Sequence, residues 1–104
     1  MIRVFVETNK DLTKEISVSG HSNYAEAGSD IVCSAVSTAM YVSLGLIENL
    51  CPKYEFKSDE KQASMILKIL ETNEITDLII ENLISTLQGI SNDYADYLEV
   101  KIRN

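Results

Sequence analysis

One cysteine and the single histidine of this chain lie close enough in sequence to suggest thiol chemistry. His21 precedes Cys33 by twelve positions in a chain of 104 residues. A cysteine attacks carbonyl groups as the thiolate, and two features favour that form: the positive end of a helix dipole and a neighbouring imidazole. Because Asp30 is a candidate N-cap, Cys33 falls in the first turn of a predicted helix. The pair therefore suggests a nucleophile, Cys33, activated by a base, His21.

Neighbouring groups in the same segment could support this pair. Ser37 lies one helical turn after Cys33 on the same face, so its hydroxyl can hydrogen-bond to the thiolate or to a substrate carbonyl. Asp30 can orient His21 as the third member of a triad, or it can simply cap the helix. The sequence leaves both roles open, and one residue can fill both. The exposed N–H groups of the first helical turn could also form an oxyanion hole.

The histidine lies in a loop, 20–29, with a glycine near each end. Gly20 and Gly28 can absorb backbone changes if this loop closes over a substrate. Tyr24, in the middle of the loop, could contact a substrate or pack beneath it. An ordinary long connection is the alternative interpretation.

Hydrophobic periodicity predicts the elements that position this segment. Alternating and β-branched runs indicate strands, and three- and four-residue spacing indicates helices. The predicted order is strands at 2–8 and 12–19, a helix at 31–50, strands at 53–58 and 63–69, a helix at 74–90 and a strand at 97–102. This ββαββαβ order predicts an α+β fold, a two-layer sandwich with two helices on one face of an antiparallel or mixed sheet of about five strands. The length suits one domain, 1–104.

On both predicted helices, residues at three- and four-residue spacing form a stripe along one face, which should pack against the sheet. On the first helix the stripe follows positions 32, 36, 39, 43, 47 and 50. On the second helix it is broad enough to leave room for a dimer contact, and it consists of Ile75, Leu78, Ile79, Leu83, Leu87 and Ile90.

Composition and charge exclude several classes of protein. The net charge is -7 and the sequence pI is about 4.5, so a basic footprint for nucleic acid is missing and anionic membranes should repel the chain. No segment is expected to span a membrane or act as a signal peptide. Cys33 and Cys51, on one predicted helix, should be roughly 27 Å apart, too far for a disulfide. Free thiols predict a cytoplasmic protein.

The segment from Gly20 to Ser37 resembles the signature of the bacterial ribosomal-processing cysteine proteases, the Prp family. The residues that carry the resemblance are Gly20, His21, Gly28, Asp30, Val32, Cys33 and Ser37. Ser22 stands where alanine is common. The resemblance implies catalytic roles for His21 and Cys33, with support from Asp30, Ser37, Gly20 and Gly28, and a thiol protease should carry no metal or cofactor. It also implies a homodimer whose substrate is the N-terminal extension of a large-subunit ribosomal protein.

Two alternatives remain open at this stage. A metal-dependent hydrolase could use His21, Asp30 and Cys33 as three ligands and keep a fourth position open, as catalytic zinc sites do. A non-catalytic, ribosome-associated dimeric binding module could keep the same fold without the chemistry. Zinc stoichiometry separates the first alternative from a thiol protease, and replacement of Cys33 by serine separates the second.

Overall fold

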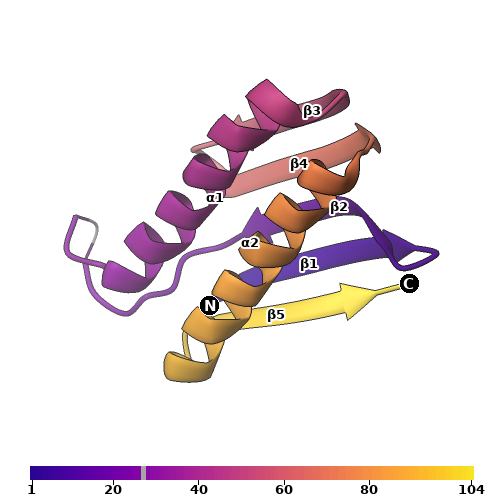
Figure 1. Cartoon of the computed structure of the whole chain (residues 1–104). Helices are drawn as coiled ribbons and strands as arrows, with labels where there is room; N and C mark the ends of the chain where they lie inside the picture. The colour runs from indigo at the N-terminus through magenta and orange to yellow at the C-terminus, as the bar shows by residue number, and fades with distance from the viewer. Residues whose placement is uncertain (27) are drawn as a thin grey trace.

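Two helices cover one face of a five-stranded sheet in this computed structural model, which describes residues 1–26 and 28–104 (Figure 1). The predicted α+β architecture and element order are therefore confirmed. The strands are β1 (Ile2–Asn9), β2 (Leu12–Ser19), β3 (Lys53–Asp59), β4 (Ser64–Glu71) and β5 (Leu98–Arg103), and the helices are α1 (Ile31–Leu50) and α2 (Glu74–Asp93). The largest difference from the predicted boundaries is at α2, which continues to Asp93 instead of ending at 90.

The sheet is mixed, with the strand order β3-β4-β2-β1-β5. The pairs β1–β2, β2–β4 and β3–β4 are antiparallel, and β5 pairs with β1 in parallel. The hairpin between β1 and β2 turns through Lys10 and Asp11, both with positive φ, and turns of this kind match the twist of the strands they join. β2 is the central strand, between β4 and β1, and the loop after β2 emerges beside the start of α1 (Figure 1).

The hydrophobic core lies between the sheet and the helices. Alternate residues of the central strands point into it, and each helix contributes one face. The largest fully buried apolar side chains are Val4, Val6, Ile16, Leu67 and Leu98 from the strands, and Val32, Val36, Met40, Ile47, Leu83 and Leu87 from the helices.

Three residues predicted to pack on the inner faces of the helices are exposed instead. Leu50 is 40% exposed, Ile75 is 52% exposed and Leu78 is 65% exposed. Leu50 is the last residue of α1, and on α2 the inward positions are 76, 80, 83 and 87. A broad apolar stripe shows that a helix packs, but it does not determine which edge of the stripe faces the sheet.

The expectation that no segment could span a membrane is wrong for α1 as far as length and composition are concerned. An 18-residue stretch of this 20-residue helix has a mean hydropathy of 1.6, and Glu48 is the one charged residue of the helix. In the structure its buried residues, among them Val36 and Met40, pack on the sheet of a compact fold with a radius of gyration of 13.2 Å. A helix that forms one wall of a core needs an apolar face of this kind.

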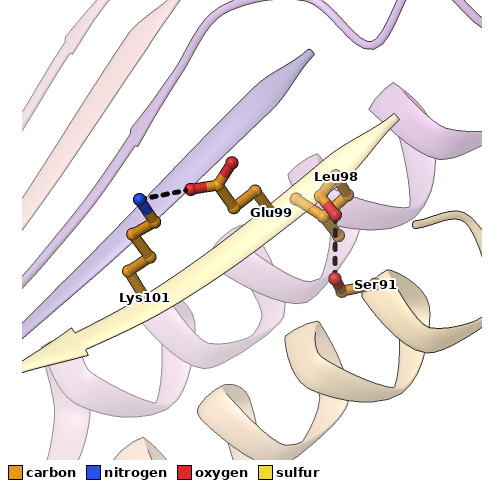
Figure 2. A network of polar contacts seen from close by, with 4 residues as sticks. All are labelled: Ser91, Leu98, Glu99 and Lys101. Carbon is orange, nitrogen blue, oxygen red and sulfur yellow. Dashed lines mark hydrogen bonds and ion pairs between the residues drawn. The ribbon is translucent and has the colours of Figure 1, made fainter. Parts of the chain in front are cut away.

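One polar contact joins the end of α2 to β5, and a second lies within β5 (Figure 2). The hydroxyl of Ser91 on α2 donates to the carbonyl oxygen of Leu98 at 2.8 Å, which determines where the chain enters β5. Lys101 Nζ lies 3.0 Å from Glu99 Oε1, because residues two apart on a strand share a face. This exposed ion pair should add little to stability.

Candidate active site

The chain leaves β2 through a sharp turn at Gly20, which directly precedes His21. Gly20 has a φ of +93°, a left-handed conformation that glycine adopts without steric cost. Its N–H donates to the carbonyl oxygen of Ala63 at 3.0 Å and so ties the end of β2 to the residue before β4. A Cβ at this position would lie 2.6 Å from the carbonyl oxygen of Met1. Both the backbone conformation and the lack of space therefore favour glycine here.

Asp30 is the N-cap of α1, and it holds the first turn that carries Cys33. Its Oδ1 accepts hydrogen bonds from the N–H groups of Val32 and Cys33, both at 3.0 Å. The N–H of Ser34 donates to the backbone carbonyl oxygen of Asp30 at 3.1 Å. The suggested oxyanion hole is therefore not free in this structure, because Asp30 already pairs these amides.

The other carboxylate oxygen of Asp30 organises the loop before the helix. Oδ2 accepts a hydrogen bond from the Ser22 hydroxyl and lies 3.2 Å from the N–H nitrogen of Tyr24 and 3.4 Å from that of Ala25. Burial, which leaves Asp30 6% exposed, acts to raise the pKa of this carboxyl. The hydrogen bonds from Ser22 and the backbone outweigh burial and lower the pKa from 3.8 to about 2. Asp30 is therefore a carboxylate at neutral pH.

The depressed pKa of Asp30 predicts a specific loss of stability in acid. Because the pKa is about 2 in the folded chain and 3.8 ordinarily, the unfolded chain takes up the proton first as the pH falls. The stabilisation by the carboxylate is complete above about pH 4 and disappears as the pH falls through 2. The variant Asp30→Asn lacks this titration. We expect the difference in melting temperature between the two proteins to be largest near neutral pH and to shrink towards pH 2.

Thermal unfolding followed by circular dichroism at several pH values measures this difference. Asp11→Asn, in the exposed hairpin turn, is the control for the loss of one negative charge. A difference between Asp30→Asn and the unmodified protein that stays constant down to pH 2 would contradict the prediction.

Tyr24 anchors the same loop to the end of α2. Its ring packs edge to face against Tyr94 and Tyr97, with ring centroids 5.6 and 5.1 Å away. Aromatic pairs of this geometry contribute about 0.5–1.5 kcal/mol each beyond the area they bury. Of the two roles that the sequence leaves open for Tyr24, packing is the one present in this structure.

Two clefts meet at His21 and Cys33, which line both. The first, with a volume of about 350 Å³, is mainly apolar, and its walls include Ile2, Val18, Val36, Tyr41 and Met65. The second, with a volume of about 470 Å³, is more polar, and its walls include Asn23, Glu26 and Ser34. A chain that crossed from one cleft to the other would therefore pass the thiol and the imidazole.

The residues predicted for the site lie around these two clefts. Apart from the shared pair, they line one cleft each: Gly20 and Ser37 the apolar cleft, and Gly28 and Asp30 the polar cleft. Within residues 1–26 and 28–104, the structure has no hydrogen bond from His21 to Cys33 or to Asp30. Catalytic hydrogen bonds are often long in free enzymes and tighten around substrate. The triad role of Asp30 stays a prediction.

Ser22 is the site residue that sequence reasoning missed. Its side chain is 2% exposed, and its Oγ lies 3.4 Å from Cys33 Sγ. The available signal was a polar residue directly after the histidine, at a position where the family resemblance leads one to expect alanine. A buried hydroxyl requires hydrogen-bond partners, and here these are Asp30 Oδ2, the N–H of Tyr24 and Cys33 Sγ.

The comparisons with known proteins identify the family. Residues 1–99 match the family described as "Cysteine protease Prp". The chain belongs to the Prp family of cysteine proteases. A "Ribosomal processing cysteine protease Prp" from Mycoplasma genitalium is 26% identical over 100 residues, which cover 96% of this chain and 94% of the relative. The Prp protein of Staphylococcus aureus is 24% identical over 106 residues, which cover 99% of this chain and all of the relative.

Solved structures from two organisms share this fold. The Staphylococcus aureus protease, crystallised with a covalently linked product peptide, superposes with a TM-score of 0.92 at 24% identity, and the match covers 98% of this chain and 99% of that chain. A protein from Streptococcus mutans superposes with a TM-score of 0.88 at 23% identity, covering 100% and 96% of the two chains.

The metal alternative finds no support in the geometry of this Prp chain. Within the part that the structure describes, no three side chains from histidine, cysteine, aspartate and glutamate are grouped as a metal site requires. His21, Asp30 and Cys33 are therefore not assembled as a ligand set. Both carboxylate oxygens of Asp30 instead accept hydrogen bonds, Oδ2 from the loop and Oδ1 from the first turn of α1.

Proposed function

We propose that this cysteine protease is the endopeptidase that removes the N-terminal extension of a large-subunit ribosomal protein, with Cys33 as nucleophile and His21 as its base. One observation carries the assignment of the two residues: His21 and Cys33 are the pair that lines both clefts where they meet. The names of the Mycoplasma and Staphylococcus relatives, which describe ribosomal processing, support the substrate.

The proposed reaction follows from the chemistry of these two side chains. Cys33 Sγ attacks the scissile carbonyl carbon while its proton passes to the imidazole of His21. The imidazolium then protonates the leaving nitrogen, which departs as the amine of the mature protein and leaves a thioester on Cys33. Water, deprotonated by His21, hydrolyses the thioester and regenerates the thiol.

The position of Cys33 in α1 favours the charge changes of this reaction. Cys33 lies in the first turn, where the helix dipole stabilises negative charge on sulfur. Ser37 lines the apolar cleft one turn later, and we assign its hydroxyl to the substrate carbonyl. The N–H groups of Val32 and Cys33 already donate to Asp30, so the oxyanion needs a different donor, such as the Ser37 hydroxyl.

The two clefts suit the two sides of the cut peptide. We assign the apolar cleft to the residues just before the scissile bond, because the resemblance to the family implies apolar or aromatic side chains there. Its volume of about 350 Å³ and its wall of Val18, Tyr41 and Met65 fit such side chains. The polar cleft would then take the residues that follow the cut.

Incubation with a defined peptide tests this function. The peptide spans the N-terminal extension and the mature start of the large-subunit ribosomal protein from the same organism, and mass spectrometry identifies the products. We expect cleavage at one bond by the unmodified protein. A peptide that stays intact, or cleavage that Cys33→Ala performs equally well, would exclude the proposed activity and favour a binding module.

We further propose a homodimer, as the family resemblance implies. Exposed apolar side chains on the two helices, such as Val42 and Leu78, offer a surface that a second copy can cover. Light scattering at micromolar concentration measures the mass directly, and a value near 11.6 kDa would contradict the dimer.

We also propose that the chain acts in the cytoplasm as one catalytic domain, without direct contact to nucleic acid or membranes. Cys33 and Cys51 are both free thiols in the structure, which suits a reducing compartment. The net charge of -7 opposes binding to nucleic-acid and anionic lipid surfaces.

A further inference from the structure

The buried hydroxyl of Ser22 joins the N-cap of α1 to the cysteine in its first turn. Ser22 Oγ hydrogen-bonds to Asp30 Oδ2 and lies 3.4 Å from Cys33 Sγ. The N–H of Tyr24 donates to the same Oγ at 3.3 Å. A serine hydroxyl has one hydrogen to donate and two lone pairs that accept. These three contacts therefore use its full hydrogen-bonding capacity.

The direction of each hydrogen bond follows from the charge of Asp30. An ionised carboxylate accepts hydrogen bonds and donates none. Hydrogen bonds hold the pKa of Asp30 at about 2, so the single hydrogen of Ser22 points at Asp30 Oδ2 at neutral pH. The backbone N–H of Tyr24 is a donor that Ser22 Oγ shares with Asp30 Oδ2, and it faces one lone pair of Ser22 Oγ. The remaining lone pair faces Cys33 Sγ, which makes the sulfur the donor in that contact.

We propose that Ser22 is a positioning residue that holds the resting Cys33 as a neutral thiol, with its S–H directed at Ser22 Oγ. This inference rests on the proposed role of Cys33 as nucleophile. When His21 takes the proton of Cys33, the S–H bond breaks, an N–H bond forms on the imidazole, and the sulfur loses its hydrogen bond to Ser22. The hydroxyl then faces the thiolate with a lone pair, or it turns its hydrogen away from Asp30. Both arrangements oppose thiolate formation.

Other titratable groups line the same clefts as Cys33, and Ser22→Ala replaces none of them. His21 lines both clefts with it, Glu26 lines the polar cleft, and the apolar cleft is lined by Tyr41 of α1, by Asp59 at the end of β3 and by Glu60 in the turn that follows. Asp30 hydrogen-bonds to Ser22 Oγ and to the backbone N–H of Cys33. A comparison of two proteins that differ only at Ser22 therefore isolates the hydroxyl.

Alkylation of Cys33 by iodoacetamide tests the direction of this hydrogen bond. The rate is measured from pH 5 to pH 9, and peptide mapping by mass spectrometry separates Cys33 from Cys51. Because iodoacetamide reacts with the thiolate, Ser22→Ala should speed alkylation of Cys33 at pH 6 by about threefold to tenfold, the range expected for one neutral hydrogen bond. The rate at pH 9 should change much less.

The opposite result would show that Ser22 donates to the thiolate, because Ser22→Ala would then slow alkylation at pH 6. Either a slower rate or an unchanged profile would overturn the proposal. Ser43→Ala is the matched control, since Ser43 is also a buried serine but lies ten positions beyond Cys33 on α1. Its alkylation profile should equal that of the unmodified protein.

Peptide cleavage provides a separate readout. If the proposed function is correct, the acid limb of the kcat profile should move to lower pH in Ser22→Ala, while KM changes little. Alkylation needs no peptide, so it decides the role of Ser22 even if the unmodified protein leaves the ribosomal peptide intact. Failure of the proposed function and failure of this inference are therefore distinguishable.

Discussion

Replacement of Cys33 with alanine is expected to reduce cleavage of the ribosomal peptide to background, a fall in kcat/KM of more than about 10⁴-fold. Among the residues that the structure describes, His21 is the one other side chain that lines both clefts, and an imidazole cannot form the thioester. The side chain is only partly buried, so its loss leaves a small gap and the fold should persist. Peptide cleavage assays with mass-spectrometric detection measure the change.

Cys51→Ala is the matched control for this prediction. Cys51 is also a half-buried free cysteine, but it lies at the opposite end of α1, where its Sγ contacts the carbonyl oxygens of Lys53 and Glu71. Its replacement should leave kcat and KM unchanged. Equal loss of activity in both variants would point to damage of the fold and would contradict a specific role for Cys33.

His21→Ala should also reduce peptide cleavage, but by less than Cys33→Ala and mainly through kcat. Loss of a general base costs about 10²- to 10⁴-fold in rate, and the cost should fall on kcat because the role proposed for His21 is to take the proton of Cys33. His21 is exposed, so its removal should leave the melting temperature nearly unchanged. A change in KM alone would assign His21 to substrate binding.

Much of the fold could be predicted from the sequence because it follows from local periodicity. α1 begins at Ile31 because Asp30 caps it, and it ends at Leu50 just before Pro52, so both boundaries are marked by residue type. The inward face of each helix was harder to predict. Leu78 and Ile80 are equally apolar, yet only Ile80 is buried, and the sheet that decides between them is built from distant parts of the chain.

The candidate site shows the same division between local and distant information. His21, Asp30 and Cys33 belong to one continuous segment, and their residue types and spacing suggested the chemistry. The apolar cleft could not be predicted, because its walls include Ile2 from β1 and Met65 from β4, which meet only when the sheet forms. The proposed role of Ser22 could not be predicted either. It follows from the contacts of the Ser22 hydroxyl with Asp30 Oδ2 and Cys33 Sγ, which the sequence does not show.

Gly20→Ala is expected to cause the largest loss of stability among single substitutions at the site, about 3 kcal/mol or more in the free energy of unfolding. An L-residue at a φ of +93° costs about 1–2 kcal/mol by itself. The added Cβ would also lie 2.6 Å from the backbone oxygen of Met1, so the start of β1 or the end of β2 has to move. Because His21 follows directly, that movement should lower kcat/KM as well.

Gly28→Ala separates the stability lost through the backbone conformation from the stability lost through the close contact with Met1. Gly28 has nearly the same φ, +90°, but no described atom lies within 4 Å of an added Cβ. Its replacement therefore carries the conformational cost alone, about 1–2 kcal/mol. Urea denaturation of both variants at 25 °C measures the two losses. If Gly20→Ala were no less stable than Gly28→Ala, close packing against Met1 would not be what requires glycine beside the histidine, and the backbone conformation alone would account for it.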